Sequence, residues 1–207
     1  AKERLKWQIL EVKPLTKVEQ REFIHAYLGR YRKTLTAEHT RILQAHPLSG
    51  NPLFLLTVLE ELRVFGVHEE LEQRLCTLLS PPSSKGKGEE PTVDDVFEHV
   101  LARVEEDVGR QAVQRAMEAL WASRAGLLRD ELMAIAKLKP AQWAEIQNAL
   151  DESLYERAGK INFGHDYLRK AVEDRYALTK LKRRRLHRQM GEYFKELPVY
   201  GRVAEEL

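Results

Sequence analysis

The stretch at residues 80–91 constrains the fold most, because it divides the chain into two parts. Its sequence is Ser-Pro-Pro-Ser-Ser-Lys-Gly-Lys-Gly-Glu-Glu-Pro. Proline, glycine and serine dominate this stretch, and it has no apolar side chain to anchor it against a core. This composition is typical of a mobile linker between subdomains. Gly86-Lys87-Gly88 does not indicate a phosphate-binding loop, because it lacks both a preceding buried strand and the Gly-x-x-x-x-Gly-Lys-Ser/Thr spacing.

The part before the linker contains four short helical patterns separated by tight turns. Thr16 with Glu19 three residues later forms a capping box, and Thr36 marks the start of a second helix. A third helix is expected from Pro52 to about Phe65, and a fourth over about residues 68–79. Four such helices make a small bundle.

The third helix begins in the stretch Ser49-Gly50-Asn51-Pro52-Leu53-Phe54-Leu55-Leu56. Gly50 and Asn51 tolerate unusual backbone angles, Asn51 is a good N-cap, and Pro52 fits the first helical position. The apolar run that follows is typical of a central helix. The turn is therefore expected to be rigid, and starting this helix is the role that its residues support by themselves.

The part after the linker reads helix, turn, short helix, turn, helix, followed by a hairpin. Thr92 with Asp95 starts its first helix, Ser123–Leu128 is interpreted as a turn, and Pro140 opens the last helix of the trihelical core. Alternating residues on both sides of Arg157-Ala158-Gly159 predict a β-hairpin, which makes this a winged helix. We expect a mainly α protein with an arm at 1–15, a four-helix lid bundle at 16–79, the linker at 80–91, a winged-helix domain at 92–178 and a C-terminal helix with following residues at 179–207.

The composition favours a soluble helical protein. The 207 residues are 43% hydrophobic and 32% charged, and the net charge is +2. The chain has one cysteine, Cys76, without a companion Cys/His cluster, so neither an internal disulfide nor a metal site is expected. This cysteine usage fits the reducing cytoplasm. No apolar run approaches the ~20 residues that span a bilayer, so no membrane association is expected.

Two segments have features that bear on nucleic-acid binding. The expected recognition helix of the winged helix starts at Pro140 and carries Glu145, Asp151 and Glu152 but no positive charge, which favours packing over DNA readout. The run Lys180–Arg188 is strongly basic, and a nucleic acid or an acidic partner fits it. A solvated helix face is the preferred interpretation of that run.

His165 is expected at the N-terminus of the helix that follows the hairpin. The positive end of the helix dipole keeps such a histidine neutral, and it can donate one N–H to a phosphate oxygen beside the free backbone N–H groups. The interpretation that these residues favour by themselves is a local cap, in which His165 and Asp166 satisfy the helix start. No Ser/His/Asp or Cys/His set is arranged for catalysis, so no catalytic residue is expected.

Several motifs together resemble the signal-transduction NTPases with numerous domains, the STAND ATPases of the NACHT and apoptosome-adaptor type. Ser49–Leu55 resembles the family's Gly-x-Pro-Leu lid motif, and Ile161–Arg169 resembles its Phe-x-His motif. The resemblance implies that Pro52, with Gly50 and Asn51, lies beside the adenine of bound ADP or ATP. It implies that His165 contacts the β-phosphate of ADP. Residues 200–207 resemble the lead-in to C-terminal TPR or WD40 repeats.

The chain departs from the family because it contains neither a Walker A nor a Walker B motif. The resemblance therefore implies a P-loop domain before Ala1 as a partner in cis, repeats after Leu207 and homo-oligomerisation on activation. Alone, the chain is expected neither to bind nucleotide tightly nor to act as an enzyme. The implied function is a regulatory lid and winged helix that couple nucleotide state to oligomerisation. The alternatives are a stand-alone helical protein-interaction module and nucleic-acid binding through residues 180–188.

Overall fold

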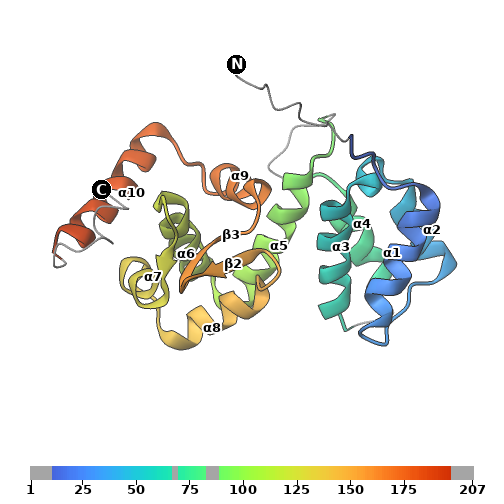
Figure 1. Cartoon of the computed structure of the whole chain (residues 1–207), viewed down its shortest axis with the longest axis horizontal. Coiled ribbons are helices and arrows are strands. Elements are labelled where there is room, and N and C mark those ends of the chain that lie inside the picture. The colour runs from blue at the N-terminus through green and yellow to red at the C-terminus, as the bar shows by residue number, and fades with distance from the viewer. Residues whose placement is uncertain (1–10, 67–69, 83–88, 197–207) are drawn as a thin grey trace, which may run out of the picture. The chain divides into compact units, whose positions relative to one another are not determined.

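The computed structural model describes residues 11–66, 70–82 and 89–196, and Figure 1 shows the path of the chain. Contacts within the chain divide it into two compact units, Ala1–Leu79 and Ser80–Leu207, each of which is described by itself. The described residues are mainly helical, with ten α-helices, one short 3-10 helix and one three-stranded sheet. None of the helices in these ranges is long and apolar enough to cross a membrane.

The described residues of the first unit form four α-helices and the 3-10 helix η1. Its core consists of leucine, isoleucine, valine and aromatic side chains from all four α-helices, among them Leu28, Leu43, Phe54 and Leu75. The central helix α3 buries residues on more than one side, as its apolar sequence predicts. The elements are α1 (Lys17–Gly29), α2 (Ala37–Ala45), η1 (Pro47–Gly50), α3 (Pro52–Val64) and α4 (Leu71–Leu79).

The predicted helix starts of this unit are confirmed. Thr16 and Glu19 form a complete capping box, in which the Thr16 backbone N–H donates to Glu19 Oε2 at 2.7 Å. The Thr36 hydroxyl accepts from the His39 backbone N–H at 3.1 Å. The first backbone N–H groups of a helix have no acceptor within the helix, and these hydrogen bonds supply one. Short polar residues such as threonine are therefore good markers of helix starts in a sequence.

In the described residues of the second unit, five helices and a small sheet pack around the helix α6. Val113, Ala116, Met117 and Leu120 of α6 are fully buried. In Figure 1 the sheet strands lie beside α6, with α8 at one end of the unit. The elements are α5 (Val93–Val108), α6 (Arg110–Ala122), β1 (Leu127–Leu128), α7 (Arg129–Ala136), α8 (Pro140–Ala149), β2 (Leu154–Arg157), β3 (Lys160–Phe163), α9 (Asp166–Arg175) and α10 (Lys180–Lys195).

The predicted hairpin is confirmed, with a tighter turn than expected. Arg157 pairs with Lys160, so the loop is only Ala158-Gly159, and both residues have positive φ (53° and 76°). Positive φ at both central residues is the backbone of the primed turns that match strand twist. The sheet order is β1-β3-β2, with all pairs antiparallel.

The interpretation of residues 123–128 as only a turn was incomplete. Leu127 and Leu128 form the short strand β1, which pairs with Ile161 and Lys160 of β3. Gly126 makes this possible with φ of 81°, and a Cβ there would lie 2.7 Å from the Ile161 carbonyl oxygen. Two residues are too few to show strand periodicity, so the sequence alone does not reveal this strand.

Three predictions lie outside the described residues. They are the arm at residues 1–10, the central part of the linker at residues 83–88, and the lead-in to repeats at residues 200–207. The division into two units at Leu79/Ser80 coincides with the start of the predicted linker.

Candidate functional site

The Gly50 turn is clamped by the chain segment that enters α1. The Leu15 backbone N–H donates to the Gly50 carbonyl at 2.8 Å, and Gln20 Nε2 donates to the Leu15 carbonyl at 2.9 Å. A Cβ on Gly50 would lie 2.9 Å from Pro14 Cβ, closer than real Cβ contacts allow. Glycine is therefore required here by the close approach of Pro14.

Asn51 and Pro52 start α3 as the sequence predicts. Asn51 Oδ1 accepts from the backbone N–H groups of Leu53 at 2.9 Å and Phe54 at 3.3 Å. Pro52 occupies the first turn, where its missing N–H leaves no hydrogen bond unmade, and its ring is exposed. The turn thus presents Pro52 to solvent on a backbone fixed by the cap.

The interior side of the turn is held by Ser49 and His46. Ser49 is fully buried, and its hydroxyl donates to the Leu43 carbonyl. The His46 ring stacks on Phe54 with 4.7 Å between ring centres, and its Nδ1 accepts from the Leu48 backbone N–H at 3.2 Å. Ser49 and His46 were not among the predicted site residues, although both lie within four residues of the predicted turn.

His165 is the N-cap residue of α9, as predicted. Its backbone is extended, its side chain makes no capping hydrogen bond, and the residue is exposed. The imidazole of His165 therefore does not cap α9, whereas Asp166 lies in the first turn, as the local-cap interpretation expects. A shallow depression of about 600 Å³ is lined by residues 163–167, which surround the helix start. A phosphate-sized anion fits the chemistry of such a helix terminus.

The C-terminal end of α9 is fixed to α5 by a buried carboxylate. Arg175 donates to Glu105 through Nε at 2.8 Å and Nη2 at 2.7 Å, and the Tyr176 hydroxyl donates at 2.8 Å. Burial by itself raises the pKa of the Glu105 carboxyl, but the hydrogen bonds from Arg175 and Tyr176 outweigh it and hold the pKa below its ordinary range. Burial and the bond to Glu105 raise the pKa of Tyr176.

Trp121 at the end of α6 joins α9 to α10. Its indole N–H donates to Glu173 of α9 at 2.8 Å, and its carbonyl accepts from Arg169 Nη2 at 2.7 Å. The guanidinium carbons of Arg169 and Arg183 lie 5.3 Å and 5.1 Å from the Trp121 ring centre, within cation–π range. The His187 ring of α10 lies 5.4 Å away.

These residues form what we call the Trp121 cluster: Trp121, Arg169, Glu173, Arg183 and His187. Arg169 lies one turn after His165 on α9, so the cluster connects the helix that carries His165 to α10. The linear sequence does not reveal this cluster. Its members come from three helices, and neither periodicity nor motif spacing brings them together.

The helices α8 and α10, which carry the two candidate nucleic-acid surfaces, differ in how their side chains interact with the rest of the unit. On α8, Trp143 and Ile146 are fully buried, which is a packing role. On α10, Lys182 pairs with Glu118 at 2.7 Å and Arg183 with Glu173 at 2.8 Å, so part of the basic run is used within the unit. Within the described ranges, no group of three His, Cys, Asp or Glu side chains is placed to hold a metal ion.

The predicted site residues fall into two groups. Gly50, Asn51 and Pro52 are adjacent in the first unit, whereas His165 belongs to the second. Gly50, Asn51 and Pro52 are consecutive and are held by hydrogen bonds within the first unit. His165 is held by its position at the start of α9 in the second unit. That the two groups face one nucleotide stays a prediction.

Comparisons with known proteins find similarity to segments of much larger proteins. A TPR repeat-containing protein of Dictyostelium discoideum is 27% identical over 194 residues, which cover 91% of this chain and 11% of that protein. Telomerase protein component 1 of Mus musculus is 30% identical over 115 residues, and that of Rattus norvegicus 29%. Each of these two matches covers 56% of this chain and 4% of the relative.

No protein-family model matches the chain, and no solved structure matches it. The chain thus spans about a tenth of the first relative and less of the others. The resemblance to STAND ATPases is not tested by these relatives and stays a prediction.

Proposed function

We propose that this chain is the lid and winged-helix region of a STAND-type signalling ATPase, and that it closes over ADP bound by a P-loop domain elsewhere in the protein. The order α6, β1, α7, α8, β2, β3 supports a winged helix, because a trihelical core is followed by a hairpin that a short strand extends. The four α-helices of the first unit support a lid bundle.

The single observation that carries the proposal is the state of His165. Its side chain is exposed at the start of α9 and makes no capping bond, beside backbone N–H groups that a helix start leaves available. A phosphate oxygen is a suitable acceptor for its ring N–H. Gly50, Asn51 and Pro52 add support, because a fixed turn with an exposed proline ring is a suitable wall for an adenine base.

The proposed mechanism is a two-state switch. With ADP bound, His165 bridges the winged helix to the β-phosphate and holds a closed, monomeric state. Exchange for ATP removes this contact, and the second unit moves to a state that oligomerises. A nucleotide shifts such an equilibrium only by its differential contacts with the two states, and the His165 contact is that difference.

The test uses the longer protein in which this chain follows its P-loop domain. His165→Ala is expected to weaken ADP retention by about tenfold, since one hydrogen bond to a charged group is worth roughly 1.5 kcal/mol. It is also expected to increase the oligomeric fraction. Nucleotide that co-purifies with the protein is measured by chromatography, and the oligomeric state by mass photometry.

The matched control is His25→Ala, which removes an exposed histidine from α1 in the first unit. It should leave both measurements unchanged. Unchanged ADP retention and an unchanged monomer in the His165 variant would show that the bridging role is wrong. A coding sequence upstream of Ala1 without a Walker A motif would overturn the whole proposal.

A second candidate is a helical protein-interaction module. The observation that favours it is the similarity of 91% of this chain to part of a protein described as TPR repeat-containing. This function requires no nucleotide. It therefore predicts that Pro52 and His165 can both be replaced by alanine without an effect on assembly of the longer protein.

A further inference from the structure

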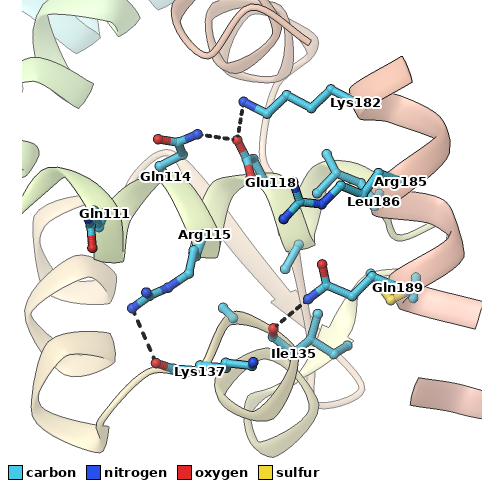
Figure 2. A pocket seen from close by; sticks show the side chains of 14 residues that line it. Gln111, Gln114, Arg115, Glu118, Ile135, Lys137, Lys182, Arg185, Leu186 and Gln189 are labelled. Atoms are coloured by element: carbon cyan, nitrogen blue, oxygen red, sulfur yellow. Dashed lines mark hydrogen bonds and ion pairs between the residues drawn. The ribbon is translucent and has the colours of Figure 1, made fainter. Parts of the chain in front are cut away.

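The second unit has a groove between α6, α7 and α10 that is separate from the His165 end of α9. Figure 2 shows it, with α6 side chains on one wall, α10 side chains on the other, and Ile135 and Lys137 below. Its volume is about 650 Å³. The size is within the range of ligand sites.

The floor of the groove is apolar and made of small or buried side chains. Ala119 and Ala122 of α6 form part of it, together with Ile135 and Ala136 of α7 and Met190 of α10. Alanines on the floor permit the close approach of another backbone. Gln111, Gln114 and Gln189 add amide groups at the edges, and Gln189 Nε2 donates to the Ile135 carbonyl at 3.1 Å.

The charge of the groove is one-sided. Four cationic side chains line it, against the single carboxylate of Glu118. Glu118 is already engaged, because Lys182 Nζ lies 2.7 Å and Gln114 Nε2 2.6 Å from its Oε1. The positive charge of Arg115, Lys137 and Arg185 is therefore not neutralised by the groove itself.

Arg185 is the cationic side chain of α10 that the groove leaves available to a ligand. Its neighbours Lys182 and Arg183 each pair with a carboxylate of the same unit. Arg185 is exposed and makes no hydrogen bond or ion pair with any residue in the part of the chain that the structure describes. Among the described residues, Arg115 makes one hydrogen bond, a long one of 3.4 Å to the Lys137 carbonyl.

We propose that this groove binds an acidic helical segment of a partner protein. The carboxylates of the segment meet Arg115, Lys137 and Arg185, and its small apolar side chains lie on the alanine floor. A helix in a groove is a common mode of peptide recognition, and charge complementarity sets its orientation. The proposal does not depend on nucleotide binding, so it stands or falls separately from the role of His165.

The test measures fluorescence anisotropy of a labelled peptide of three Leu-Ala-Glu-Glu-Ala-Ala-Glu heptads on the full chain at low salt. The peptide is expected to bind, and its counterpart with Lys for every Glu is expected not to bind. The double variant Arg115→Gln/Arg185→Gln should raise Kd by about five- to tenfold, from the loss of two exposed ion pairs. Higher salt should weaken binding to the wild type.

The matched control is Lys180→Gln/Arg184→Gln, which removes the same charge from exposed positions of α10 that do not line the groove. It should change Kd by less than about twofold, which is small beside the loss of two ion pairs. Thermal melts check that both variants fold, and amide shifts on α6, α7 and α10 in NMR spectra locate the peptide. Equal losses in the two variants, absence of binding, or equal binding of the Lys peptide would each overturn the proposal. So would a single-stranded RNA that binds more tightly than the peptide and loses affinity in the groove variant.

Discussion

The Gly50 turn of the first unit and the α5–α9 junction of the second are both fixed, but by different kinds of interaction. At the turn, a glycine meets Pro14 closely and neutral hydrogen bonds hold Ser49 and Asn51. At the junction, the buried carboxylate of Glu105 accepts three hydrogen bonds from Arg175 and Tyr176.

The difference teaches what each of these two sites responds to. The close approach of Pro14 to Gly50 and the hydrogen bonds of Ser49 and Asn51 involve no titratable side chain, so these contacts of the turn depend on shape. A buried carboxylate depends on its proton and on its partners, because an unpaired charge in the interior is costly. Of these two sites, the α5–α9 junction should therefore be the one that is sensitive to charge.

The largest expected effect comes from Glu105→Gln. The substitution leaves Arg175 with a neutral partner in a half-buried position, and we expect the free energy of unfolding of the second unit to fall by about 3 kcal/mol. Urea denaturation of the full chain, followed by the fluorescence of Trp121 and Trp143 and by hydrogen exchange in α5 and α9, measures it.

The neighbouring variant Glu106→Gln is the control, because that carboxylate is exposed. It should leave the urea midpoint unchanged. Hydrogen exchange in α1 and α3 of the first unit should be the same in both variants. A midpoint for Glu105→Gln that equals that of the wild type would show that charge does not fix the junction.

Acid should weaken the second unit through the same group, with a smaller effect. The folded-state pKa of Glu105 is lowered, so its contribution is present above the unfolded value of about 4.3 and is lost as the pH falls through the folded value. We expect the urea concentration at the midpoint of unfolding of the second unit to decrease as the pH is lowered below about 5. Glu105→Gln should show a flatter pH dependence, and equally steep profiles would contradict this assignment.

The Gly50→Ala variant tests the role of shape at the turn. Its Cβ would meet Pro14, and we expect a loss of about 1 kcal/mol, because overpacking outweighs the gain from a less flexible unfolded chain. Hydrogen exchange of the Leu15 amide, which donates to the Gly50 carbonyl, should become faster. Gly29→Ala is the control, since a Cβ there meets no atom within 4 Å and should not destabilise the unit.

The parts of the fold that the sequence predicted are those decided by nearby residues. Thr16 with Glu19, Thr92 with Asp95, and Asn51 before Pro52 each satisfy donors within three residues of their own position. The hairpin at Ala158-Gly159 is local in the same way. Short-range chemistry of this kind is visible in a linear pattern.

The parts that the sequence did not predict depend on residues far apart in the chain. Leu127 becomes a strand only because β3 lies beside it. Trp121 meets Arg169 and Arg183, which come from two later helices. In the basic run of α10, Lys182 and Arg183 form ion pairs, whereas Arg185 does not pair with any described residue. Which cations pair depends on the carboxylates that other helices bring nearby, and the periodicity of the sequence does not show this.

The smallest expected effect comes from Glu38→Gln in the first unit, and it separates charge from burial. Arg41 donates to Glu38 through Nε at 3.0 Å and Nη2 at 2.6 Å, the same two-bond geometry that joins Arg175 to Glu105. Hydrogen bonding to Arg41 likewise lowers the pKa of Glu38. Both side chains are more than half exposed, so water replaces the lost bonds, and the urea midpoint should not change. If Glu38→Gln destabilised its unit as much as Glu105→Gln does, pair geometry would be the source of charge sensitivity, and burial would no longer explain the behaviour of the α5–α9 junction.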